Sequence, residues 1–203
     1  MTTLSRWLNL MTALQLGGNE ATGQALLTAY SEPHRHYHTA QHLDDCLLKL
    51  DAVAGRAKDA AEIEVALWFH DAIYNPLKGG NELASAKWAK RFLTEAGSAQ
   101  ARAESVYALV MATQHAVPAA TDDAKLLVDI DLSILGADES DYETFEQNVR
   151  KEYRCVPYFL YRKKRREILQ SFLDRPYIYE KEHFRKKFEA NARKNLRLAI
   201  ATL

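Results

Sequence analysis

Residues 67–75 read LWFHDAIYN, which places two ionisable side chains, His70 and Asp71, inside a nearly unbroken apolar run. A helix that is apolar nearly all round is a central, buried one. A carboxylate in such surroundings costs several kcal/mol unless it is paired, hydrogen-bonded or bound to a metal. An adjacent histidine and aspartate suit a metal ion, and the alternative is a buried ion pair. We expect the rest of the chain to be organised around this stretch.

The signals on either side of the run predict a helix. Asp59 is followed three residues later by Glu62, which resembles a capping box at a helix start. Asn75 and Pro76 form a stop signal after the run. We therefore predict one helix of about four turns between Asp59 and Asn75.

The remaining apolar residues also recur at helical spacing, and no alternating strand pattern persists. We find no internal repeat and no linker, so residues 1–203 are predicted to form a single all-α domain. Helices are expected at residues 3–16, 21–31 and 37–53, from Asn81 or Glu82 to about Ala96, after Ser98, within 126–135, from about 141, over 157–174 and from about 183.

A second group of histidines precedes the central run. The helix expected over 37–53 has its apolar stripe at Leu43, Cys46, Leu47 and Leu50. His42 lies on the edge of this stripe, and His38 lies one turn earlier on the same predicted face. The alternative is a surface cluster that also includes His34 and His36.

Acidic side chains interrupt a second apolar segment. Asp129 and Asp131 lie inside the piece Leu126–Leu135, so the unusual placement of carboxylates among apolar residues occurs twice. Single histidines elsewhere, such as His115 and His183, are more often satisfied core residues than ligands.

Length and composition favour a self-sufficient fold in a reducing compartment. A chain of 203 residues buries roughly 70% of its unfolded surface, enough for a core of its own. Cys46 and Cys155 are too few for a disulfide framework. We see no leader-like N-terminus and no apolar stretch of about 18 residues, the length of a membrane span. We therefore expect a soluble, cytoplasmic protein with no membrane partner.

The net charge is zero but unevenly distributed. Residues 150–197 contain 16 Lys and Arg against 6 Asp and Glu, a balance of +10, so the remainder carries −10. The densest part is the five-residue basic run Arg162–Arg166. Such a run can bind nucleic acid, but we favour a helix face that docks on an acidic one.

The order His42, His70-Asp71, Asp129 resembles the HD superfamily of metal-dependent phosphohydrolases. Its signature is a histidine, a His-Asp doublet and a later aspartate on separate helices. The segment 37–42, YHTAQH, resembles the element of its cyclic-nucleotide phosphodiesterase branch, in which the second histidine binds metal and the first donates a proton.

Within the superfamily, the chain most resembles predicted phosphohydrolases of about 200 residues. The shared features are Pro33-x-Arg35-His36-Tyr37-His38 and the ending over residues 189–196, EANARKNL. The general signature covers residues 37–131, and the narrower likeness covers most of the chain. The resemblance implies a helical HD bundle with additional C-terminal helices over about 138–203.

The resemblance also implies a metal site. Its ligands would be His42, His70, Asp71 and Asp129, while Asp131 would bond a ligand or cap the next turn. Two imidazoles and two carboxylates suit a divalent ion of manganese, iron, cobalt, nickel or zinc, with magnesium at an oxygen-rich neighbouring position.

A phosphohydrolase of this type would act by metal-activated water on a phosphomonoester, phosphodiester or nucleotide. His38 would be the proton donor, and Asp71 would serve catalysis as well as the metal. Arg35 and Lys78 are candidate phosphate contacts, and His115 is a further candidate for substrate binding.

Two other functions fit the pattern. One is a non-catalytic HD module that binds a metal, a nucleotide or a protein partner, although the retained His38 counts against it. The other is an HD-type di-iron oxygenase, which needs more histidines between the doublet and the last aspartate, where this chain has only His115. The sequence leaves open the substrate, the metal, the number of ions and the oligomeric state.

Overall fold

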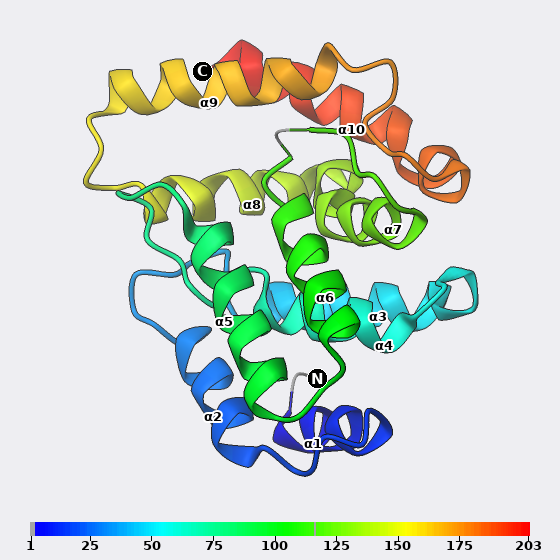
Figure 1. Ribbon diagram of the computed structural model, residues 1–203. Helices are drawn as coiled ribbons and strands as arrows, with labels where there is room; N and C mark the ends of the chain where they lie inside the picture. Colours follow the sequence, from blue (N-terminus) through cyan, green and yellow to red (C-terminus); the bar gives the residue numbers. More distant parts are fainter. Residues whose placement is uncertain (1–2, 116) are drawn as a thin grey trace. The chain divides into compact units, whose positions relative to one another are not determined.

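The computed structural model describes residues 3–115 and 117–203, and within these ranges the protein is all-α, as predicted (Figure 1). The described residues form ten α-helices and two short 3-10 helices, with no strand. The chain divides into two compact units, Met1–Val128 and Asp129–Leu203. No helix among the described residues is both long enough and apolar enough to cross a membrane.

The first unit is built around helix α4 (labelled in Figure 1), which packs on α1, α3, α5 and α6. Six of its ten residues are buried, including the consecutive run Val65–Phe69. The helices of this unit are α1 (Leu4–Ala13), α2 (Glu20–Ala29), α3 (Ala40–Val53), α4 (Ala60–Phe69), α5 (Asn81–Glu95) and α6 (Gln100–Ala112), with the 3-10 helix η1 (Ala54–Arg56) after α3.

The predicted start of the central helix is confirmed. Asp59 has extended backbone angles at the N-cap, and its carboxylate accepts the N–H of Glu62 at 3.0 Å. This hydrogen bond satisfies one of the amides that a helix N-terminus leaves without an intrahelical partner.

The predicted end of the same helix is wrong. α4 stops at Phe69, not at Asn75, and turns follow it. Side chains there bond the carbonyls near the end of the helix: the imidazole Nδ1 of His70 lies 2.7 Å from the oxygen of Leu67. The Tyr30 hydroxyl donates to the oxygen of Trp68 at 3.2 Å. The last carbonyls are therefore satisfied without a further helical turn.

The helix that carries His42 also begins later than predicted. α3 starts at Ala40, with Thr39 at its N-cap in an extended conformation, so His38 lies in the irregular segment before the helix. The prediction that His38 and His42 share a helical face is therefore wrong. The reason is that the backbone at Thr39 leaves the helical region one residue before the helix begins.

Two glycines with left-handed backbone flank α5. Gly80 is the N-cap, with a φ of +86°, and Gly97 follows the helix with a φ of +79°. Left-handed backbone of this kind strongly favours glycine. The N–H of Ser98 then bonds the oxygen of Leu93 at 2.9 Å, which closes the end of the helix.

Helix α7 (Asp122–Asp131) crosses the boundary between the two units, and the 3-10 helix η2 (Leu132–Gly136) follows it. Together they correspond to the apolar segment 126–135 that the sequence predicted. The other helices of the second unit are α8 (Glu139–Glu152), α9 (Tyr158–Leu173) and α10 (Glu182–Thr202).

The second unit is held together by contacts of α10 with η2, α8 and α9. The buried carboxamide of Asn195 donates to the oxygens of Leu135 and Ala137 at 3.0 and 2.9 Å. In the basic run of α9, Arg165 pairs with Glu146 of α8 through two hydrogen bonds of 3.0 and 2.6 Å. The other four residues of the run are exposed.

Candidate metal centre

Three potential metal ligands of the first unit converge at the end of α4. His42 on α3 and His70 at the C-cap of α4 are buried, and their Nε2 atoms lie 3.1 Å apart. The Oδ2 atom of Asp71 lies 3.0 Å from Nε2 of His70 and 3.6 Å from Nε2 of His42. The structure thus brings together three of the four predicted ligands.

These separations fit a shared metal ion. Nitrogen and oxygen ligands bind transition metals at about 2.0–2.2 Å, so two ligands of one ion lie about 3.0 Å apart at a right angle and about 3.4 Å apart at a tetrahedral angle. The three distances of 3.0, 3.1 and 3.6 Å span this range. The donor set is therefore compatible with a divalent ion.

The hydrogen bond of His70 prepares it to be a ligand. Its Nδ1 lies 2.7 Å from the carbonyl oxygen of Leu67, and a carbonyl only accepts, so Nδ1 carries the proton. In the neutral imidazole, Nε2 then presents its lone pair toward His42 and Asp71. A second-shell carbonyl that fixes the tautomer in this way is the usual companion of a metal-binding histidine.

The imidazoles around Asp71 keep its carboxylate ionised. Burial by itself raises the pKa of Asp71. While no metal is bound and the imidazoles are protonated, the charges of His70, His38 and His42 and the hydrogen bond from Nε2 of His70 outweigh burial. The net effect is a pKa well below the usual range of an aspartate. A metal ion at Nε2 of His70 would take the place of the proton on that nitrogen. An ionised carboxylate is the form that a metal binds.

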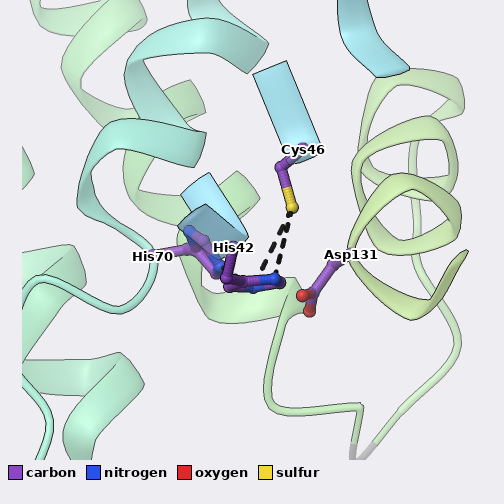
Figure 2. Close-up of side chains that lie close together, drawn as sticks. All are labelled: His42, Cys46, His70 and Asp131. Carbon is purple, nitrogen blue, oxygen red and sulfur yellow. Dashed lines mark hydrogen bonds between the residues drawn. The ribbon is translucent and has the colours of Figure 1, made fainter. Parts of the chain in front are cut away.

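Cys46 is a further neighbour of the site. The sequence predicts Cys46 only as part of the apolar stripe of this helix, α3. Its buried sulfur lies 3.9 Å from each ring nitrogen of His42. Dashed lines in Figure 2 mark these two contacts. One potential ligand atom each of His42, Cys46 and His70 lies within 4.8 Å of the others. The signal that could have predicted this proximity is the spacing of four residues between His42 and Cys46 on one helix.

The position of the sulfur argues against a direct bond to the same ion. Cys46 Sγ is equally far from Nδ1 and Nε2 of His42. The sulfur therefore does not lie in the direction of the Nε2 lone pair, along which a metal bound to Nε2 would lie. Figure 2 also labels Asp131, which is the last residue of α7 and belongs to the second unit.

The predicted proton donor, His38, lies beside this group although it is outside α3. Its ring centroid is 6.0 Å from that of His42 and 4.2 Å from that of Tyr74, on which it stacks. Tyr37 completes the aromatic surroundings, with its ring 4.7 Å from that of His42. His38 thus lies near the predicted ligand His42 although the two residues do not share a helix.

Arg35, predicted to contact phosphate, bonds the protein backbone in this structure. Its guanidinium donates to the carbonyl oxygens of His38, Asp71 and Ala72 at 3.0, 2.7 and 3.1 Å. The side chain has no exposed surface. Lys78 is exposed in the loop before α5, and the substrate roles of Lys78 and His115 stay predictions.

The fourth predicted ligand, Asp129, has partners within the second unit. It is fully buried, and its two oxygens accept the N–H groups of Glu180 and Lys181 at 2.8 and 2.7 Å, just before α10 begins. Burial raises the pKa of Asp129 to about 7 against the effect of these two hydrogen bonds. Its role as a ligand stays a prediction.

Comparisons with known proteins identify no relative: no protein-family model, no curated protein and no solved structure matches the chain significantly. Conclusions about the site therefore rest on the side chains described above.

Proposed function

We propose that this protein is a metal-dependent phosphohydrolase whose divalent ion is held by His42, His70 and Asp71. The observation that carries the proposal is the triangle of two Nε2 atoms and one Oδ2 atom, 3.0 to 3.6 Å apart. The orienting bond from His70 to Leu67 adds the feature expected of a ligand. The resemblance to the HD superfamily supports the reaction class.

A further carboxylate is needed to complete the predicted ligand set. The resemblance implies Asp129, but both oxygens of that side chain already accept backbone N–H groups. Asp131 is the competing candidate, because it is the other carboxylate of the same acidic doublet, two residues later. Substitution of each aspartate separately distinguishes the two.

The site suits the hydrolysis of a phosphomonoester, a phosphodiester or a nucleotide. A divalent ion bound there supplies a Lewis acid that polarises a phosphoryl oxygen and lowers the pKa of water. The mixed nitrogen and oxygen donors suit manganese, iron, cobalt, nickel or zinc, with magnesium as a further possibility.

The protein's own residues would divide the remaining work. Ionised Asp71 and the lone pair of His70 fix the donor geometry. His38, next to His42 but stacked on Tyr74, would protonate the oxygen of the leaving group. Proton transfer of this kind contributes about 10²- to 10⁴-fold to a rate.

Elemental analysis of the purified protein, joined to a panel of phosphoesters, tests the proposal. We expect stoichiometric transition metal and metal-dependent hydrolysis, and we expect His70→Ala and Asp71→Ala to lose both. His183→Ala is the matched control, because His183 is an exposed histidine of the second unit. Metal retained in both ligand variants would contradict the assignment.

Two further outcomes would identify the additional ligand and distinguish the enzyme from a non-catalytic module. Metal lost from Asp131→Asn but kept in Asp129→Asn would assign the additional ligand to Asp131, and the reverse result would support Asp129. Bound metal without turnover of any ester would favour the alternative function, a non-catalytic module that binds metal or nucleotide.

A further inference from the structure

Two irregular segments of the first unit, residues 34–38 and 71–74, are joined by direct hydrogen bonds. The guanidinium of Arg35 donates to the oxygen of Asp71 at 2.7 Å and to that of Ala72 at 3.1 Å. Nε2 of His34 lies 2.9 Å from the carbonyl oxygen of Tyr74. The segment that carries the predicted proton donor is thus tied to the turn that carries a predicted ligand.

The same guanidinium also fixes its own segment. It donates to the oxygen of His38 at 3.0 Å and to the carboxylate of Glu32 at 2.9 Å. One rigid, planar group therefore links the backbone of His38 to the backbone of Asp71. A lysine ammonium is a point charge without this fork and cannot reach several carbonyls in one plane.

Tyr74 adds a second link between the segments. The ring of His38 stacks on it with centroids 4.2 Å apart and planes 29° apart. The guanidinium of Arg35 lies 5.4 Å from the centroid of the Tyr74 ring. The backbone of His38 is thus held by Arg35, while its imidazole is held by Tyr74.

We infer that Arg35 and Tyr74 form a clasp that positions the imidazole of His38 relative to the His42, His70 and Asp71 ligand group. Both are positioning residues, since they act through His38 and not on the substrate. The inference rests on the proposed function for its effect on catalysis, but the clasp itself can be tested without any activity. A proton donor misplaced by about 1 Å loses much of its effect on rate.

Four variants test the clasp. Arg35→Lys keeps the charge but removes the fork, and Arg56→Lys is its control because Arg56 is an exposed arginine at the end of η1. Tyr74→Leu removes the aromatic ring, and Tyr74→Phe keeps it. We expect Arg35→Lys and Tyr74→Leu to retain the metal, and Tyr74→Phe to behave as the unchanged protein.

The kinetic readout compares two esters. Turnover of an alkyl phosphate, whose leaving group needs a proton, should fall about 10- to 100-fold in Arg35→Lys and Tyr74→Leu. Turnover of a nitrophenyl phosphate, whose leaving group departs without help, should change by less than about threefold, because general acid catalysis contributes little there. Equal losses on both esters, or loss of the metal, would show a merely structural role and overturn the inference.

The second readout is the nuclear magnetic resonance signal of the carbon-bound protons of His38. A ring stacked 4.2 Å from Tyr74 experiences the ring current of that tyrosine. The signal should therefore move in Tyr74→Leu and stay in Tyr74→Phe and Arg56→Lys. An unmoved signal in Tyr74→Leu would refute the clasp, whether or not the protein hydrolyses an ester. Absence of hydrolysis on every ester would refute only the proposed function.

Discussion

His38 and His42 show how two residues that are equivalent in sequence spacing become different in space. His42 lies on α3, and its Nε2 lies 3.1 Å from Nε2 of His70 and 3.6 Å from Oδ2 of Asp71. His38 precedes the helix, and its ring lies against Tyr74. The four-residue spacing predicted that both rings would lie near one site because they share a helical face. The rings do lie near each other, but His38 is placed there by the irregular segment before α3.

The two histidines should therefore respond differently to substitution. We expect His42→Ala to lose metal and activity together, because the ion loses a direct bond. His38→Ala should keep the metal and slow turnover by about 10²- to 10⁴-fold, with a smaller loss on esters that have good leaving groups. Metal content and rates on both ester types check this. Metal lost from His38→Ala and kept in His42→Ala would reverse the two roles.

The side chains that gather at the candidate metal centre were easier to predict than the contacts around them. The acidic and imidazole side chains of His70 and Asp71 stand out because they interrupt an apolar run. The bonds of Arg35 to the oxygens of Asp71 and Ala72 join residues 36 and 37 positions apart. No local pattern encodes such a partner, so the sequence places Arg35 near the site but does not predict its hydrogen bonds to the backbone.

Among the elements, α4 has a predictable beginning and an unpredictable end. Asp59 and Glu62 form a local signal that acts within one turn. The end depends on Tyr30, whose hydroxyl reaches the oxygen of Trp68 from 38 residues away. The apolar run continues past Phe69 through Ala72 and Ile73, and this composition suggested more helix than the hydrogen bonds allow.

The packing of α10 on η2 gives a prediction at the scale of elements. A Cβ added at Gly136 would lie 2.6 Å from the backbone oxygen and from the Cβ of Phe188, so the two backbones would have to separate. We expect Gly136→Ala to lower the free energy of unfolding by about 2 kcal/mol, within the range for overpacking. Urea unfolding followed by circular dichroism measures the loss.

Gly55→Ala in η1 is the control for this substitution, because nothing lies within 4 Å of the added Cβ. Its effect on the free energy of unfolding should stay within about 0.5 kcal/mol, as for other open surface sites. Equal stability of the two variants would mean that η2 and α10 do not pack as closely as described.

For the whole molecule, the all-α class followed from helical apolar spacing along most of the chain, and the structure confirms it. The division into two compact units after Val128 falls inside α7, where the sequence has no linker, glycine or proline to mark it. The prediction that residues 1–203 form one domain stays a prediction. If residues 1–203 form one domain, we expect the protein to unfold in a single cooperative transition.

The positions of the tryptophans allow the unfolding of the first unit, which contains the candidate metal centre, to be followed by fluorescence. All three tryptophans, Trp7, Trp68 and Trp88, lie in the first unit, so their fluorescence reports that unit, while far-ultraviolet circular dichroism reports the helices of both. If the chain unfolds as one domain, the two thermal midpoints coincide. A second dichroism transition without a fluorescence counterpart would contradict the single-domain prediction.

Removal of the metal should then shift the fluorescence midpoint. An ion present at about 100 times its Kd adds about 2.7 kcal/mol to the stability of the folded state. For a chain of this length, 1 kcal/mol corresponds to about 2–4 °C in Tm, so chelation should lower the midpoint by about 5–10 °C. His42→Ala should show no such shift, because its site no longer holds the ion. An equal shift in that variant would mean that the chelator removes an ion bound elsewhere, and the ligand assignment would fail.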